Sequence, residues 1–548
     1  MRILFLVGTF GMLRHFDTVV ETLHDRGHDI TLAVTERGET SYELPRTLEQ
    51  GPRLRRIGAP AHRGERFRLT TRILRSLRDC HLYQTPAYQD AHALRRRAFD
   101  RMLEVTSGGT QNLPDDPTAT WLALTDEQRG RLSGFFAAVE DLVPSEPLFE
   151  QFLLACRPDI VLITPLVHLG SNHPDYVKAA KKLGIPTGFP VFSWDNLSSK
   201  GALHVTPDRM FVWNETQKAE AVNLHGVDPA SVVVTGASRF DKFFEMTPSV
   251  DRESFCQRYD LDPARAIVCY LGSSPFVAPD ERGFVRDWIR ALRSSSNSRL
   301  AGAGVIIRPH PRSLSQWEGT KMPPVEDAGV RLVTSRRMDS EPLLYDCLFH
   351  ADAVVALNTS AQLEAAILGK PIFTVLAPGS APGQVESLHF RYLLRGEGGC
   401  VEVAADLSEH VQQLGRALDG EYDRGRVRDF TTRFIRPHGL DRPVTPIVAD
   451  AFEALGELAA PRQPGSLRGT VRGFARDVAE RLAGPRPDTE AQDTPAMVLM
   501  DPVESRRLRR DHAEVKELRR EVRRLKRHLA QVKQRAGVAG LPDEPAGE

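Results

Sequence analysis

The sequence feature that most constrains the fold is the stretch HADAVVALNTSAQLEAAILGKPIFTVL, at residues 350–376. An apolar strand pattern at residues 352–357 leads into the polar turn Asn358-Thr359-Ser360, and a helical pattern and a second strand pattern follow. A strand, a polar turn and a helix start together can offer backbone N–H groups and hydroxyls to a diphosphate. Glu364 lies one helical turn beyond Ser360, within reach of a sugar or ribose hydroxyl. The stretch therefore predicts a nucleotide-diphosphate pocket in the second of two Rossmann-like domains.

A second motif of the same domain is the strand pattern Val305-Ile306-Ile307, which runs into the rigid turn Arg308-Pro309-His310-Pro311. A cation beside a diphosphate stabilises the charge that grows as a phosphate leaves, so Arg308 and His310 are candidate catalytic residues. Gly272-Ser273-Ser274 ends the first strand of this domain, where small residues let a backbone approach a phosphate closely. An ordinary turn is the alternative interpretation of each segment.

The first 34 residues predict the opening β-α-β unit of another doubly wound sheet. A strand is followed by the turn Gly8-x-x-Gly11, a helix at about 14–26 and a strand at 29–34. His15 would lie near the helix N-terminus, where the helix dipole disfavours the imidazolium and keeps the ring able to accept a proton. His15 is therefore a candidate general base, with a substrate contact or a structural turn residue as the alternatives.

The segment Ser193-Trp194-Asp195-Asn196-Leu197-Ser198-Ser199-Lys200-Gly201 also carries dense polar chemistry. It follows an apolar strand pattern, and open α/β sheets bind ligands at the carboxyl ends of their strands. Asp195 is the second candidate general base, and Lys200 is notable because lysine is scarce beside arginine in this chain. The alternative is a surface loop in which Trp194 is half-buried.

The chain has 548 residues, which exceeds a single hydrophobic core, so we expect two domains with appendages. The first domain is predicted at 1–245, with a helical insertion at about 66–155. A linker at about 244–262 leads to the second domain at 262–458. The strands of the second domain are predicted at 266–271, 304–308, 352–357 and 371–375.

The composition excludes several classes of protein. The 72 basic and 72 acidic residues balance, so bulk charge indicates neither nucleic-acid nor membrane binding. The six cysteines are scattered without a Cys-x-x-Cys pair, which argues against a disulfide framework or a zinc site and fits a reducing compartment. The pair Asp260 and Asp262 has the spacing of metal ligands but is better explained as a cap, so no metal is expected. No apolar run approaches the ~18–20 residues of a membrane span, and the apolar start at Met1 is too short for a signal peptide. We therefore expect a soluble, cytoplasmic protein.

The last 90 residues form a different kind of sequence. Residues 459–500 have the composition of a linker, with one amphipathic pattern whose apolar face is Leu467, Val471, Phe474, Val478 and Leu482. This short helix would dock on its own domain or, alternatively, contact the inner face of a membrane. Residues 503–535 predict a coiled coil, because Leu508, Val515, Val522 and Leu529 recur every seven residues. Such a helix would join two chains over 506–533; a basic helix that binds polyanions is the alternative.

These segments resemble the GT-B glycosyltransferases, and most closely the bacterial surface-polysaccharide enzymes that include CDP-glycerol glycerophosphotransferase-like proteins. The matching motifs are GTFGMLRHF with GHDITLAV, RPDIVLITPLV, FSWDNLSSKG, VWNETQKAEAVNLHGV with VVVTGASRFD, IIRPHPR, and ALNTSAQLEAAILGKPIFTV. The likeness covers roughly residues 1–455, and its last two motifs are the most specific. The large insertion and the coiled coil depart from a minimal chain of this family, which leaves the acceptor open.

The resemblance implies an α/β chain of two Rossmann-like domains facing a cleft. The donor would lie in the C-terminal domain, with the family's phosphate-binding turn at Thr359 and Ser360. The acceptor would lie on the N-terminal side, near Gly11, Trp194, Asn196 and Lys200. Such enzymes are usually metal-independent, so no cofactor is expected beyond the nucleotide-activated donor.

Three functions remain open on the sequence alone. The first is transfer of a sugar or polyol phosphate from a nucleotide-diphosphate donor to a cell-surface polymer or a lipid-linked precursor. The second is 2-epimerisation of a nucleotide sugar, which needs acid and base groups on both faces of the sugar carbon, and no convincing carboxylate cluster supports it. The third is a non-catalytic scaffold that binds polyanions through its basic tail, which the balanced charge of the body disfavours.

Overall fold

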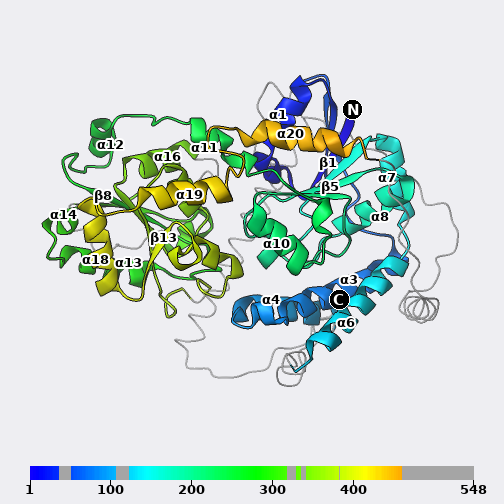
Figure 1. The fold of residues 1–548 in the computed structure, drawn as a ribbon, viewed down its shortest axis with the longest axis horizontal. Helices are drawn as coiled ribbons and strands as arrows, with labels where there is room; N and C mark the ends of the chain where they lie inside the picture. The colour runs from blue at the N-terminus through cyan, green and yellow to red at the C-terminus, as the bar shows by residue number, and fades with distance from the viewer. Residues whose placement is uncertain (36–50, 107–122, 318–328, 335–340, 382, 459–548) are drawn as a thin grey trace, which may run out of the picture.

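The computed structural model describes residues 1–35, 51–106, 123–317, 329–334, 341–381 and 383–458. These residues form two lobes, each built around a twisted sheet with helices on both faces (Figure 1). The amphipathic pattern and the coiled coil expected beyond residue 458 lie outside the described residues.

The first sheet has seven parallel strands in the order β3-β2-β1-β4-β5-β6-β7. Its strands are β1 (Arg2–Val7), β2 (Asp29–Val34), β3 (Leu54–Gly58), β4 (Ile160–Thr164), β5 (Thr187–Pro190), β6 (Arg209–Val212) and β7 (Val232–Val234). The strand order reverses between β1 and β4, and this topological switch point is where doubly wound sheets bind ligands.

The second sheet has six parallel strands in the order β10-β9-β8-β11-β12-β13. Its strands are β8 (Ile267–Leu271), β9 (Gly304–Arg308), β10 (Val330–Leu332), β11 (Ala353–Ala356), β12 (Ile372–Val375) and β13 (Val401–Ala404). Counted from β8, this is the order 3-2-1-4-5-6 of a Rossmann domain, with its switch point between β8 and β11. Two Rossmann-like domains, the architecture of the GT-B fold, are therefore confirmed.

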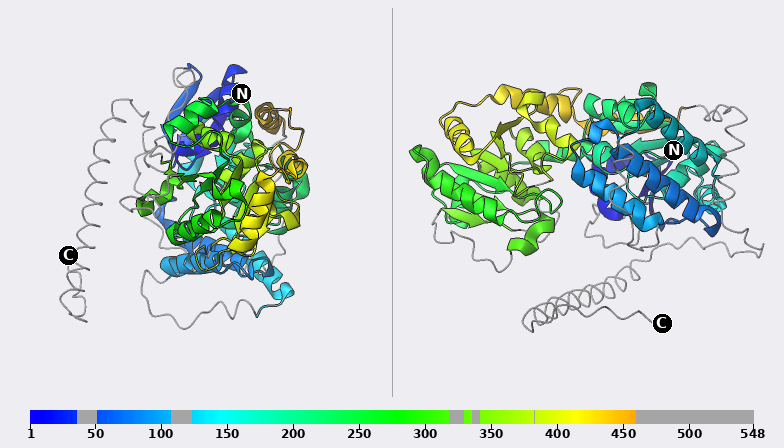
Figure 2. Two further views of the ribbon diagram at one scale, coloured as in Figure 1. Left: turned by 90° about the vertical axis from the view of Figure 1, so that its left-hand side faces the viewer. Right: turned by 90° about the horizontal axis from the view of Figure 1, so that it is seen from below.

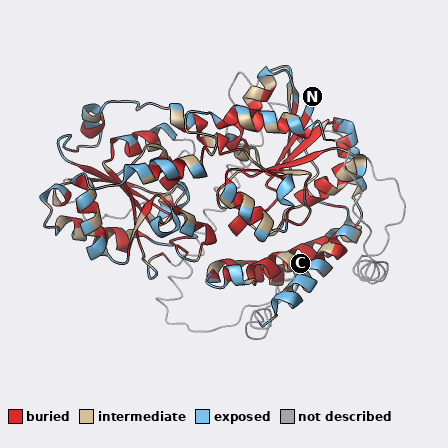
Figure 3. Cartoon of the chain, viewed as in Figure 1, coloured by how far each residue is buried: buried red, intermediate tan, exposed pale blue. Residues whose placement is uncertain are grey.

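Continuous apolar runs explain why the central strands lie inside. Residues Leu4 to Val7 of β1 and all of β4 and β8 are buried, as strands covered by helices on both faces must be (Figure 3). The covering helices of the first sheet are α1 (Asp17–Asp25), α7 (Pro147–Cys156), α8 (His173–Leu183), α10 (Glu215–Asn223) and α20 (Val444–Leu455). Those of the second include α13 (Arg282–Arg293), α16 (Glu341–His350), α17 (Ala361–Ile367), α18 (Leu407–Leu418) and α19 (Arg424–Phe434).

Three insertion helices, α3 (Glu65–Tyr83), α4 (His92–Thr106) and α6 (Asp126–Leu142), pack together beside the first domain. Seen from below, α3 and α4 run across the front of that domain (Figure 2). The sequence placed the end of the insertion at about 155, but α7 belongs to the sheet layer. Its residues Phe149, Phe152 and Leu153 share one buried cluster with Val161 and Ile163 of β4, so the insertion is shorter than expected.

Helix α20 also differs from the sequence-based division, which placed it in the second domain. Val444, Val448 and Phe452 pack with Ile3 and Phe5 of β1, so the chain returns to the first sheet after completing the second. The apolar face of α20 covers a side of the first sheet that would otherwise be exposed, which is the physical reason for the return.

The region expected as a linker at 244–262 holds a helix, α12 (Arg252–Arg258). Asp251 caps α12 by accepting a hydrogen bond from the Ser254 amide, and Phe255 is fully buried in the core of the second domain. Strands β3, β10 and β13 were not predicted either. They lie at or beside sheet edges and are partly exposed, so they lack the continuous apolar run by which the central strands were recognised.

Candidate functional site between the two sheets

The second sheet brings three segments together at its switch point. Leu271 of β8 pairs with Ala356 of β11 on one side and with Arg308 of β9 on the other. The segments 272–274, 308–310 and 358–360 therefore all leave the carboxyl edge of the sheet side by side. The Asn358 amide donates to Ser273 Oγ at 3.3 Å, which ties two of these segments directly.

Position 272 has to be glycine because the neighbouring turn leaves no room for a side chain. A Cβ at this position would lie 2.9 Å from the His310 amide nitrogen and 3.1 Å from Pro309 Cα. The sequence attributed this glycine to close approach of a phosphate, whereas the structure gives packing against the Pro309-His310 turn as the cause. Gly272 thereby holds the turn against the end of β8.

Two of the backbone amides expected to bind phosphate are engaged within the protein. The Ser273 amide donates to Glu281 Oε1 at 2.8 Å, and the Thr359 amide donates to Gln362 Oε1 at 3.1 Å. Helix α17 begins after Ser360 and spans 7 residues. The Ser273 and Thr359 amides are therefore not available to a phosphate, and side chains have to supply part of its recognition. The hydroxyls of Thr359 and Ser360 remain candidates, since Thr359 is half-buried and Ser360 is exposed.

A group of arginines from both domains supplies positive charge at this edge of the second sheet. Arg239 follows β7 of the first domain, and its Nη2 lies 3.2 Å from Oε1 of Glu364 on α17 of the second. Removal from solvent lowers the pKa of Arg14, and the charges of Arg239 and Arg312 lower it further. Arg14 is therefore close enough to be repelled by each of the other two guanidinium groups, while Glu341 and Glu364 oppose that effect.

None of these three arginines was predicted as a site residue. Arg14 precedes His15, Arg239 stands in the motif GASRFD, and Arg312 follows the RPHP turn. Their positions inside or beside recognised motifs were the available signal. Proximity across two domains could not be deduced from a sequence pattern.

Glu364 is buried, and burial raises its pKa above the ordinary value while Arg239 opposes that change. Its Oε2 atom has no hydrogen-bond partner among the described residues. A buried carboxylate oxygen without a donor is costly, and a ligand hydroxyl would satisfy it. The predicted role of Glu364, binding a hydroxyl of the donor, is compatible with this position.

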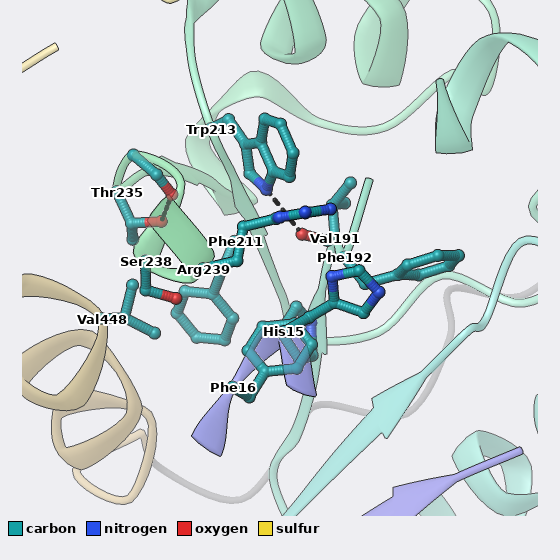
Figure 4. Close-up of a pocket in the computed structure, with 12 residues that line it drawn as sticks. His15, Phe16, Val191, Phe192, Phe211, Trp213, Thr235, Ser238, Arg239 and Val448 are labelled. Carbon is teal, nitrogen blue, oxygen red and sulfur yellow. Dashed lines mark hydrogen bonds between the residues drawn. The ribbon is translucent and has the colours of Figure 1, made fainter. Parts of the chain in front are cut away.

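His15 lies across from this edge, in a narrow cavity lined also by Phe192, Thr235, Ser238 and Arg239 (Figure 4). Its ring packs against Phe192 with centroids 5.3 Å apart, and its Nδ1 has no hydrogen-bond partner in the described part of the chain. Burial, and then the charges of Arg239 and Arg14, hold its pKa well below the ordinary value. The ring is therefore neutral, as the sequence predicted, but the dominant cause is burial and not the helix dipole.

Asp195 is less suited to accept a proton. Lys200 Nζ lies 2.8 Å from its Oδ2, and the hydroxyls of Ser193 and Ser199 donate to its carboxylate. Burial alone would raise its pKa, but the Lys200 and His389 charges and these hydrogen bonds hold it below the ordinary value. Of the two residues predicted as general bases, His15 is therefore the better supported.

The other residues placed on the acceptor side have mainly structural contacts. Trp194 is buried and its ring lies 4.6 Å from that of His389 in the second domain. Asn196 Nδ2 donates to Val167 O at 2.9 Å, which fixes the loop after β4. Gly11 is half-exposed, and a Cβ there would meet only Thr9 Oγ1, at 3.8 Å. Their contact with an acceptor stays a prediction.

Among the described residues, no group of three or more His, Cys, Asp or Glu side chains is arranged to hold a metal ion. His310 lies at the turn after β9, where burial and the Arg312 charge lower its pKa to about 4. None of the helices in the described ranges combines the length and the apolar character needed to cross a bilayer.

Comparison with known proteins yields only remote structural likenesses. No family model and no curated protein matches this chain. A UDP-GlcNAc 2-epimerase from Methanocaldococcus jannaschii superposes with a TM-score of 0.43 and 12% identity, over 83% of this chain and 100% of that chain. A glycosyltransferase from Rickettsia africae gives 0.45 and 10%, over 83% and 98%, and the calicheamicin glycosyltransferase CalG4 gives 0.42 and 14%, over 84% and 99%. These likenesses are too distant to bear on the reaction, so the function has to be inferred from the residues of this chain.

Proposed function

We propose that this chain is a transferase that moves a sugar or polyol phosphate from a nucleotide-diphosphate donor to a cell-surface polymer or its precursor. The observation that carries the proposal is the convergence of guanidinium groups from both domains at the switch point of the second sheet. Guanidinium groups gathered in this way, with Glu341 and Glu364 as the nearby carboxylates, can bind an anion of high charge, such as a diphosphate.

The residues suggest a division of labour. The diphosphate lies against Arg14, Arg239, Arg308 and Arg312, which stabilise the negative charge that accumulates on the departing phosphate. Glu364 Oε2 accepts a hydrogen bond from a donor hydroxyl. His15 is neutral, and its Nε2 accepts a hydrogen bond from Arg14 Nε at 3.4 Å; at this nitrogen it takes the proton of the acceptor hydroxyl as the hydroxyl oxygen forms the new bond. The bond between the transferred group and the departing nucleotide breaks in the same step.

The first experiment is a thermal-shift screen with UDP, GDP, CDP, dTDP and CMP. A nucleotide that binds the native protein must raise its unfolding temperature, so one of these should do so and thereby name the donor base. If none of them shifts the transition even at millimolar concentration, the donor site does not exist and the proposal fails.

The second experiment uses the identified donor with the variant Arg308→Ala. Loss of one charge-stabilising group should lower turnover by about 10²–10³-fold while the fold stays intact. Arg299→Ala, an exposed arginine of α14 (Ser298–Ala301), is the matched control and should keep parental turnover. Parental turnover in Arg308→Ala would remove this residue from the mechanism. Incubation with a UDP-sugar and no acceptor separates transfer from 2-epimerisation, because only an epimerase would release the epimer.

A further inference from the structure

A second cavity lies between the insertion helices and the first sheet. It has a volume of about 250 Å³, far above the ~10–15 Å³ that one water molecule needs by the same measure. Its lining includes Arg68 and Arg72 of α3, Arg101 of α4, His62 and the turn 170–172. His62 follows the end of β3 and the turn follows the end of β4, so the cavity opens at the carboxyl edge of the first sheet. It is separate from the arginines that converge on the second sheet.

The charge of this cavity is positive, and of Arg68, Arg72 and Arg101 only Arg101 has a carboxylate partner among the described residues, Glu104 at 2.6 Å. Arg68 and Arg72 are exposed, stand one helical turn apart on α3, and form no side-chain hydrogen bond or ion pair with any described residue. Like charges at this spacing destabilise a helix. Asp79, the carboxylate of the lining, already accepts a hydrogen bond from the Ala202 amide at 2.7 Å and lies 3.3 Å from His204 Nε2.

The neighbours of Arg75 and Arg101 explain why the positive charge of the cavity persists. Arg75, which also lines the cavity, is neutralised by Glu140 and Asp175 at 2.8 Å each, so those carboxylates are not available to Arg68 and Arg72. A Cβ at Gly170, whose φ is +77°, would lie 3.0 Å from Arg101 Nη2. Glycine at this turn therefore leaves room for the Arg101 guanidinium.

Neutral donors complete the lining. Asn172 Nδ2 lies 2.9 Å from His62 Nδ1. Because an amide nitrogen can only donate, His62 Nδ1 must accept, and the ring hydrogen lies on Nε2. Burial and the charges of Arg68 and Arg72 lower the pKa of His62, which keeps the ring neutral. Ser171, whose Oγ accepts from the His173 amide at 3.1 Å, can still donate its own hydrogen.

We propose that this cavity binds a phosphate group, held by Arg68 and Arg72 with Arg101 and the neutral donors at the rim. The Asp79–Ala202 hydrogen bond joins the cavity wall to the loop that carries Lys200 and Asp195. A ligand anchored there could extend along this loop toward His15, so the phosphate belongs to the acceptor. The acceptor role rests on the proposed function, whereas phosphate binding does not.

The test is the double variant R68Q/R72Q, in which glutamine preserves helix propensity and removes both charges. Binding of glycerol 3-phosphate is measured by calorimetry, and binding of vesicles of phosphatidylglycerol in phosphatidylcholine is measured by flotation, so that a soluble phosphate and a lipid headgroup are distinguished. The matched control is R96Q/R131Q, two exposed arginines of the same insertion that lie outside the cavity. The nucleotide thermal shift is recorded for every protein as an independent measure of the fold and of the donor site.

We expect the parent and R96Q/R131Q to bind one of the two probes and R68Q/R72Q to bind it at least about tenfold more weakly, with the nucleotide shift unchanged. Equal binding by R68Q/R72Q and the parent, equal weakening in both double variants, or no binding of either probe by the parent would overturn the proposal. If the phosphate probe behaves as expected while no nucleotide binds, the site stands and the proposed transferase function falls. If a nucleotide binds but neither phosphate probe behaves as expected, the donor site stands and only the proposed phosphate site falls.

Discussion

At the scale of single residues, the clearest prediction concerns His15. His15→Ala should lower turnover by about 10²–10⁴-fold, the usual contribution of a positioned base. Because burial and two arginines hold the His15 pKa well below 6.5, the ring stays deprotonated from weakly acidic to neutral pH. Turnover should therefore be flat across pH 6–8 and fall only at lower pH. The measurement is the pH profile of kcat with the identified donor.

His92→Ala is the control, since His92 is exposed at the start of α4. It should keep both the turnover and the pH profile of the parent. A parental profile that falls with a midpoint near the ordinary histidine value, or turnover retained in His15→Ala, would contradict the assignment. Asp195 would then be the remaining candidate base.

The residues of the candidate site were only partly accessible from the sequence. Ser273, Arg308 and Asn358 follow apolar strand patterns, and parallel strands end at one edge, so their gathering follows from local pattern and topology. Arg239 belongs to the other domain and reaches Glu364 only because the two domains pack face to face. The contact between Arg239 and Glu364 leaves no repeating pattern in the sequence from which it could be predicted. The engaged amides of Ser273 and Thr359 depend on the side chains of Glu281 and Gln362, which a backbone pattern does not show.

At the scale of helices and strands, apolar pattern decided what could be predicted. Strands β2 and β9 have the bounds expected, and Asn214 caps α10 by accepting a hydrogen bond from the Gln217 amide at 2.9 Å. Helix α12 was missed because its seven residues show too little periodicity, although Asp251 gives it a cap. The return of α20 to the first sheet is decided by tertiary packing. Its sequence predicts an apolar face, but that face could have covered either sheet.

The insertion helices offer a prediction at this scale, because buried charges join them to the first domain. Arg75 of α3 contacts Asp175 of α8 and Glu140 of α6, all with side chains at most 5% exposed. Burial opposes ionisation of these acids, but the Arg75 charge holds the pKa of each below its ordinary value. Arg75→Leu leaves two buried carboxylates with one cation fewer and should cost about 3–5 kcal/mol in the stability of the insertion. Hydrogen exchange in α3 and α6 measures the change.

The same pair of carboxylates gives the sign of the pH dependence. A carboxylate whose pKa is lowered by folding adds stability at neutral pH, and this stability is lost as pH falls below its ordinary pKa. The difference between Arg75→Leu and the parent should therefore be largest at pH 7 and smaller at about pH 3, below the ordinary pKa of both carboxyls. Arg131→Leu, an exposed arginine of α6, should behave as the parent at both values. A difference that is independent of pH would mean that lost packing, and not lost charge, explains the variant.

At the scale of the whole molecule, the insertion contacts both domains. The Ala93 amide at the start of α4 donates to Glu386 Oε2 at 2.6 Å, and Arg97 of α4 lies over the Phe276 ring at 5.3 Å. Both partners belong to the second domain, as does His389, which packs on Trp194. These contacts join the first domain and its insertion to the second domain, which carries Glu364. The insertion thus supports the donor site while lining the second cavity.

Assembly is the last property of the whole chain, and it depends on the tail outside the described residues. We propose that residues 506–533 form a parallel two-stranded coiled coil, in which Glu514 and Glu521 face Arg519 and Lys526 of the other chain. Four heptads span only about 40 Å, and Asp511 at a core position weakens the first, so the dimer should be modest in affinity.

Deleting residues 501–548 should give a monomer in sedimentation velocity that keeps the nucleotide thermal shift, because both Rossmann-like domains end before the deletion. The surplus of arginines repels across the seam, so moderate salt should strengthen the dimer of the full chain by screening that repulsion. Higher salt should weaken it again as the Glu514–Arg519 and Glu521–Lys526 pairs are screened as well. A truncated protein that still sediments as a dimer would move the interface into the two domains and leave the tail as a basic docking helix.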